Sequence, residues 1–97
     1  MMLLPPEWRV VTSPGFDAEL DGLARDGART GAILKGWEFY LGRNPVRFSW
    51  GLTTEDDEMR LISTVDDREG AEYFAGLWID RRHQTVHLTW VQRRELD

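Results

Sequence analysis

The sequence has no cysteine, a single lysine and no apolar run long enough to cross a bilayer. The absence of cysteine excludes disulfides and thiolate chemistry, and it suits a reducing compartment. A membrane-spanning helix needs about 20 consecutive apolar residues, which excludes a membrane-embedded class of protein. Residues 1–6 are too few and too rich in proline for a signal peptide. We therefore expect a cytoplasmic protein with no membrane partner.

Positive charge is also scarce, because the net charge is −5. An acidic surface repels a polyanion, so indiscriminate binding of nucleic acid is disfavoured. Lys35 is the only lysine among the twelve basic side chains. The remaining arginines suit bidentate contacts with phosphate or carboxylate, although genome composition can produce the same bias.

Motifs for metals and cofactors are missing. No group of histidines and carboxylates has the spacing of a zinc site, and there is no glycine-rich phosphate loop or nucleophile elbow. The acidic run Glu55–Glu58 lacks the alternating ligand spacing of a calcium loop, so a solvated turn is expected there. We expect neither a metal nor a cofactor.

The first half of the chain predicts a strand followed by two helices. Residues 7–12 form a short β-branched run that ends at a turn. Ser13 and Pro14 are typical of an N-cap and a first helical position, and apolar residues then recur at helical spacing as far as a C-cap at Gly27. A second helix is predicted over residues 29–41, with Trp37 on its apolar stripe. Two such helices joined by a tight turn indicate a helical hairpin packed on a sheet.

The second half predicts strands. Residues 46–52 alternate with period two, and further strands are expected over 59–65, 72–79 and 85–92. The links between them are short, which implies antiparallel pairing. The length allows one domain, residues 1–97. We therefore predict a single α+β domain of order β-α-α-β-β-β(-β), with the helices on a curved antiparallel sheet.

Five tryptophans are unusual in a chain of this size, and alternation places most of them in the core. Trp37, Trp78 and Trp90 are expected to be buried. Trp8 and Trp50 are open to either reading, and an exposed one would mark a partner surface.

Three segments together resemble the RelE/ParE superfamily of bacterial type II toxin–antitoxin toxins, which includes plasmid-stabilisation proteins. Residues 10–20 resemble its opening strand and capped first helix, and residues 59–62 resemble the strand that carries an arginine after the helical pair. Residues 73–80, followed by residues 85–91 and Arg93, resemble its closing hairpin. The resemblance covers residues 8–94.

This resemblance implies a toxin that is neutralised by a cognate antitoxin. Members of the RelE type cleave mRNA in the ribosome, members of the ParE type poison DNA gyrase, and some relatives have no demonstrated toxicity. The expected targets are therefore DNA gyrase or the ribosome with its mRNA, and a homodimer is compatible with the pattern. The acidic charge favours growth inhibition through a protein target such as gyrase. A metal-independent endoribonuclease and a non-toxic interaction module are the alternatives.

Cleavage of RNA without a metal needs a base, an acid and a group that stabilises the phosphorane. Arg60 and Arg93 are the candidates for phosphate stabilisation, and His87 is the candidate acid or base because its usual pKa is near neutrality. If Val86, Leu88 and Trp90 face the helices, then His87 and Arg93 share the other face.

Each candidate has a plainer interpretation. The two arginines can be solvated residues or partners of nearby acids, and His87 can be a packed histidine. Ribosome-cutting members of the family carry a dense basic cluster, often with lysines, from which this sequence departs.

Overall fold

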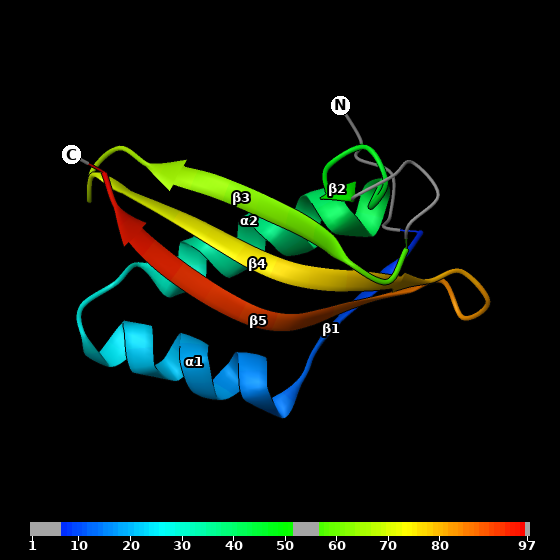
Figure 1. The fold of residues 1–97 in the computed structure, drawn as a ribbon, viewed down its shortest axis with the longest axis horizontal. Coiled ribbons are helices and arrows are strands. Elements are labelled where there is room, and N and C mark those ends of the chain that lie inside the picture. Colours follow the sequence, from blue (N-terminus) through cyan, green and yellow to red (C-terminus); the bar gives the residue numbers. More distant parts are fainter. Residues whose placement is uncertain (1–6, 52–56, 97) are drawn as a thin grey trace.

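Two helices lie on one face of a five-stranded sheet in the computed structural model, which describes residues 7–51 and 57–96 (Figure 1). In chain order the elements are β1 (Arg9–Thr12), α1 (Pro14–Arg25), α2 (Thr30–Arg43), β2 (Trp50–Gly51), β3 (Arg60–Asp66), β4 (Ala71–Asp80) and β5 (Thr85–Glu95). The predicted α+β class and element order are confirmed. Neither helix of the described ranges is long and apolar enough to span a membrane.

The strand order across the sheet is β1-β5-β4-β3-β2. Strands β2 to β5 form the predicted antiparallel meander, and the long β4–β5 hairpin is its centre. β1 joins the outer edge of β5 in parallel, with Val10 opposite Val86. The sheet is therefore mixed, and it curves along β4 and β5 (Figure 1).

The start of α1 follows from its cap. The Ser13 hydroxyl accepts a hydrogen bond from the Phe16 amide at 3.1 Å, with Pro14 at the first helical position. The same hydroxyl donates to the carbonyl oxygen of Thr89 in β5 at 3.0 Å. The cap residue thus satisfies a helix end and ties α1 to the sheet.

The core lies between the helices and the sheet. Trp37 is buried at its centre, as predicted, and its indole N–H donates to the Thr64 hydroxyl of β3 at 2.9 Å. The bond gives a buried donor its partner. The buried apolar side chains are Phe16, Ile33, Trp37, Leu41, Ile62, Ala71, Tyr73, Ala75, Leu77, Ile79, Val86, Leu88 and Val91.

A bulge in β5 overturns the predicted faces of that strand. Leu88 pairs with Leu77 and Trp90 pairs with Gly76, so Thr89 is an extra residue in β5. The side-chain alternation therefore shifts by one position after Leu88. The prediction that Trp90 faces the helices is wrong, because Trp90 lies on the open face of the sheet.

The predicted strand over residues 46–52 is also wrong for most of its length. Residues 45–48 form a turn, in which the Asn44 side chain accepts from the Arg47 amide at 3.1 Å. Within residues 46–51, the described part of this segment, only Trp50 and Gly51 pair with β3. Leu52 and the first half of the predicted turn at Glu55–Glu58 lie outside the described residues.

Gly76 is required by the indole of Trp90. A Cβ built on Gly76 would lie 2.1 Å from Nε1 of Trp90, far inside van der Waals contact. We expect Gly76→Ala to lower the free energy of unfolding by about 1–3 kcal/mol, the usual cost of overpacking. Urea unfolding followed by Trp fluorescence measures the change.

The matched control is Gly36→Ala in α2, where a new Cβ meets nothing within 4 Å. We expect this change to stabilise the protein by about 0.5–1 kcal/mol, since alanine is the better helix former. Equal midpoints for Gly76→Ala and the wild type would show that the Trp90 ring does not lie over Gly76.

Candidate functional site

The bulge separates the three predicted site residues. Arg93 pairs with the buried Tyr73, and Arg60 is itself buried, so both arginines belong to the face that the helices cover. His87 pairs with Trp78 on the open face. The expectation that His87 and Arg93 share one face is wrong, because it assumed a β5 without a bulge.

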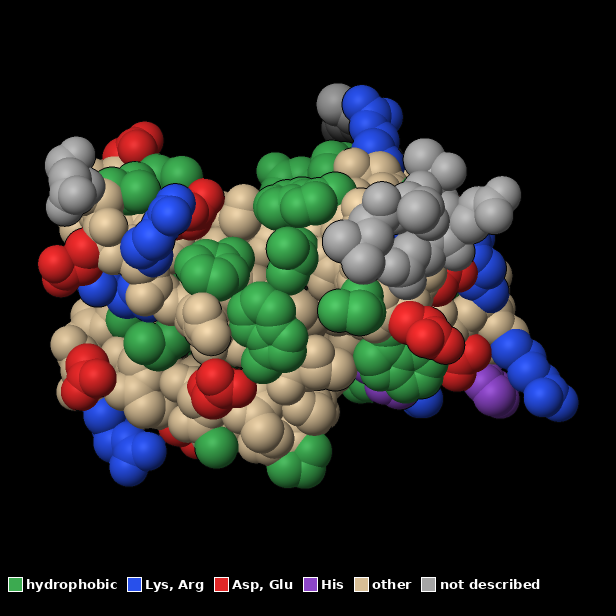
Figure 2. Space-filling view, viewed as in Figure 1, with side chains coloured by type: hydrophobic (Ala, Val, Ile, Leu, Met, Phe, Trp, Pro, Cys, Tyr) green, Lys and Arg blue, Asp and Glu red, His purple; other side chains and the backbone are tan. Residues whose placement is uncertain are grey.

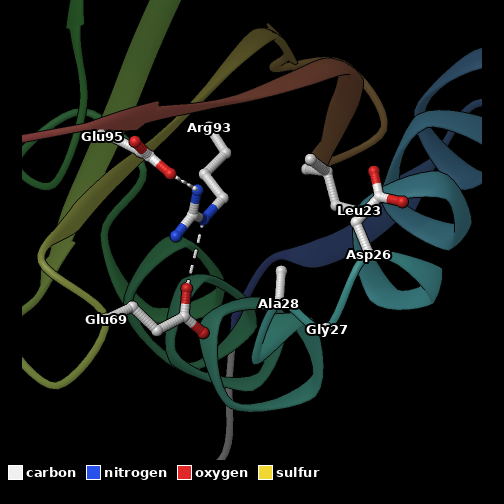
Figure 3. Close-up of a pocket in the computed structure, with 7 residues that line it drawn as sticks. All are labelled: Leu23, Asp26, Gly27, Ala28, Glu69, Arg93 and Glu95. Carbon is white, nitrogen blue, oxygen red and sulfur yellow. Dashed lines mark hydrogen bonds and ion pairs between the residues drawn. The ribbon is translucent and has the colours of Figure 1, made fainter.

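Arg93 lies in a pocket of about 380 Å³ at the end of β5, beside the link between the two helices (Figure 3). Its Nε donates to Oε2 of Glu69 at 3.2 Å, and its Nη1 is 3.6 Å from Oε1 of Glu95. Asp26 contributes a third carboxylate to the lining. One guanidinium among three carboxylates leaves the pocket negatively charged, which disfavours a phosphate. The lining residues are Leu23, Asp26, Gly27, Ala28, Glu69, Arg93 and Glu95.

Glu69 connects three parts of the fold. Its Oε1 accepts from the backbone N–H of Arg29 at 2.6 Å, and its Oε2 accepts from the Tyr73 hydroxyl as well as from Arg93. The bond from Tyr73, then those from Arg29 and Arg93, lower the pKa of Glu69, while partial burial opposes them. The carboxylate thus joins the α1–α2 link to β4 and β5.

Tyr73 and Arg93 keep their protons in this cluster. Burial, followed by the hydrogen bond to Glu69, raises the pKa of Tyr73. The neighbouring Tyr73 hydroxyl and the Glu69 carboxylate raise the pKa of Arg93. A general acid or base works best with a pKa near the operating pH, and these shifts move both groups away from neutrality. The cluster is therefore suited to holding the fold together.

Arg60 is buried under the turn that precedes β2. Its Nε donates to the Ser49 hydroxyl at 2.8 Å, and its Nη2 donates to the carbonyl oxygens of Ser49 and Val46 at 3.0 and 3.1 Å. Only 4% of the residue is exposed. These bonds hold residues 46–49 against the sheet, which is a positioning role within the protein.

His87 is half-buried on the open face and stacks on Trp78. The two rings are parallel within 4°, and their centroids are 3.9 Å apart. Near it, Asp80 accepts a hydrogen bond from the backbone N–H of His83, whose ring also contacts the Asp80 carboxylate. The contact with His83 is the main cause of the lowered pKa of Asp80, and His87 adds a smaller effect. In the described ranges no group of three or more His or acidic side chains could hold a metal ion.

The open face carries an apolar surface. Trp78 and Trp90, which were both expected in the core, belong to it, so the prediction for Trp78 is wrong as well. Figure 2 shows hydrophobic side chains gathered across the middle of this face. Trp50 is 51% and Val65 49% exposed, while Trp90 borders a hollow of about 180 Å³. We call this the open-face surface. It comprises Trp50, Met59, Leu61, Val65, Phe74, Trp78 and Trp90.

One sequence signal could have located this surface. Gly76 stands alone inside an otherwise continuous strand pattern, and such a glycine often marks a bulge or a close approach. Because Gly76 has no side chain, the ring of its pairing partner Trp90 can lie flat over the strand. The face on which this occurs depends on the bulge.

Loss of Arg60 should destabilise the fold. Arg60→Ala leaves three acceptors without a donor and opens a cavity, so we expect the free energy of unfolding to fall by about 2–4 kcal/mol. Arg68→Ala, at an exposed turn position, is the control and should change it by less than about 0.5 kcal/mol. Urea denaturation measures both. A fully stable Arg60→Ala protein would contradict the positioning role.

The lowered pKa of Glu69 should make the free energy of unfolding fall as the pH becomes acidic. Its folded-state pKa is lowered from 4.5, so its contribution is present above pH 4.5 and is lost as the pH falls through the folded value. We expect Glu69→Gln to be less stable than the wild type at pH 7, with a gap that narrows below pH 4.5. Thermal unfolding between pH 3 and 7 measures the gap. A gap that does not change with pH would mean that the charge of Glu69 contributes nothing.

No family model and no curated protein matches the sequence. Among solved structures, the chain is similar to one from the toxin–antitoxin complex RelBE2 of Mycobacterium tuberculosis. The two are 25% identical, with a TM-score of 0.66, and the match covers 94% of this chain and 100% of that one. The sequence resemblance and the structural similarity agree over nearly the whole chain, which is a domain of the RelE/ParE type.

Proposed function

We propose that this chain is the toxin of a type II toxin–antitoxin system and that it inhibits growth by binding a protein target such as DNA gyrase. The observation that carries the proposal is its similarity, over 94% of its length, to a chain of the RelBE2 toxin–antitoxin complex. A cognate antitoxin neutralises it by binding. The proposal implies that the chain acts in the cytoplasm, where such targets occur. It also implies that residues 1–97 act as one domain.

The arrangement of charge supports a protein target over RNA. Arg93 is matched by two carboxylates, and the side chain of Arg60 is enclosed by residues 46–49. His87 lies on the opposite face of the sheet from both. Stabilisation of a phosphorane needs cations that converge on one point, and the three predicted catalytic residues do not converge in this structure.

The open-face surface supports binding through an apolar contact. Aromatic residues are enriched in protein interfaces, and exposed apolar patches mark places where partners bind. Trp50, Trp78 and Trp90 supply large rings on a rigid sheet, which lose little conformational freedom on association. We assign contact with the protein target to this surface.

Induced expression in a bacterial host tests the proposal. We expect growth arrest with intact mRNA and, for a gyrase target, induction of the DNA-damage response. Arg93→Ala should still arrest growth, because its role is structural in this account. Codon-positioned mRNA cuts that vanish in Arg93→Ala would contradict the proposal in favour of an endoribonuclease, and normal growth would favour a non-toxic module.

A pair of variants tests the assigned surface. Val65→Asp places a charge on the open-face surface and should relieve growth arrest at an unchanged level of soluble protein. Ala18→Asp adds the same charge on the exposed side of α1 and should leave the arrest intact. Growth arrest that is equally strong in both variants would contradict the assignment of target binding to the open-face surface.

A further inference from the structure

A second exposed aromatic surface lies at the end of α2 and on the turn after it. Phe39 and Tyr40 are 40% and 47% exposed, and Phe48 from the turn is 36% exposed. Its residues come from α2 and the turn after it, whereas the open-face surface is formed by the strands of the sheet and by Met59 next to β3. We call it the α2-end surface. It comprises Lys35, Phe39, Tyr40, Arg43, Arg47 and Phe48.

The rings form a connected row. The centroids of Phe39 and Tyr40 are 5.3 Å apart in an edge-to-face arrangement, and those of Tyr40 and Phe48 are 4.9 Å apart. Each end of the row carries a guanidinium. Arg43 lies 3.7 Å above the Phe39 ring, and Arg47 lies 5.6 Å from the Phe48 centroid. Stacking of this kind holds a cation in place over an aromatic ring.

The charge around the row is positive in an otherwise acidic protein. A hollow of about 430 Å³ between α2 and β1 is lined by Arg9, Lys35 and Arg43 against one acid, Glu38. Among the residues that the structure describes, no ion pair involves Arg9, Lys35 or Arg47. This contrasts with Arg93, which two carboxylates neutralise.

We propose that the α2-end surface binds an acidic polypeptide segment of a partner protein. A carboxylate can meet the Lys35 ammonium or the outward edge of the Arg47 guanidinium, while an apolar side chain packs beside the exposed Tyr40 ring. A single-stranded nucleic acid fits less well. Bases stack on open ring faces, and here guanidinium groups already lie over Phe39 and Phe48.

Titration of a synthetic peptide into the isotope-labelled full-length chain tests this proposal. The probe is a peptide of repeating Glu-Leu-Glu-Asp units, and its control has repeating Gln-Leu-Gln-Asn units. We expect the acidic peptide to shift the backbone amide signals of residues 35–48 and the amide control to leave them unchanged. Lys35→Glu with Arg47→Glu should weaken the binding at least about tenfold.

The charge-matched control is Arg68→Glu with Arg82→Glu, which changes two exposed turn positions outside the surface and should bind as the wild type does. Equal weakening in both double variants, or no binding of the acidic peptide, would overturn the proposal. Tighter binding of an oligothymidylate at the same amides would assign the surface to nucleic acid instead. The measurement needs neither growth arrest nor an antitoxin, so it is independent of the toxin proposal.

Discussion

The extra residue Thr89 in β5 determines which side chains reach each face of the sheet. It shifts the alternation so that Val91 and Arg93 turn toward the helices while Trp90 turns away from them. The bulge is held from both sides, because the Thr89 carbonyl accepts from Ser13 at 3.0 Å and its hydroxyl donates to the Gly76 carbonyl at 3.1 Å. The bond that ties the cap of α1 to the sheet, the flat packing of Trp90 over the neighbouring strand, and the open-face surface all depend on this one irregularity.

At the end of the sheet where β3 turns into β4, Glu69 likewise connects several parts of the fold. Its carboxylate accepts hydrogen bonds from the α1–α2 link, from β4 and from β5, and these bonds lower its pKa. The bond from Arg93 holds that half-buried side chain against Glu69. An arginine at the end of the closing strand could serve a ribonuclease only if its charge were available to a substrate. Here Glu69 and Glu95 pair with that charge inside the fold. The resemblance to the family at Arg93 therefore supports a shared fold more directly than it supports a shared reaction.

Local signals predicted most of the fold, because each depends on neighbours in the chain. Ser13 and Pro14 located the start of α1, and the short link after Asp80 predicted the β4–β5 hairpin. The faces of β5 could not be predicted, because a bulge depends on contacts between residues far apart in sequence. Arg60 was a candidate for phosphate stabilisation, with a solvated residue or a partner of nearby acids as the alternatives. It is buried because residues 46–49 turn over it where a strand was predicted. Arg60, Arg93 and His87 therefore lie in separate parts of the structure, because tertiary contacts decide where each side chain goes.

The net negative charge of the chain does not describe every part of its surface, because the charges are unevenly distributed. Net charge governs long-range steering, whereas contacts at a surface respond to charges within about 8–10 Å at physiological salt. The ion pairs of Arg29, Arg81, Arg93 and Arg94 neutralise those arginines locally. Arg9, Lys35 and Arg47 have no such partner in the described ranges. Arg9 and Lys35 line one hollow beside α2, and Arg47 lies against Phe48 on the turn after it. A protein with a net charge of −5 can therefore repel nucleic acid at a distance and still present a positive surface at close range to an acidic partner.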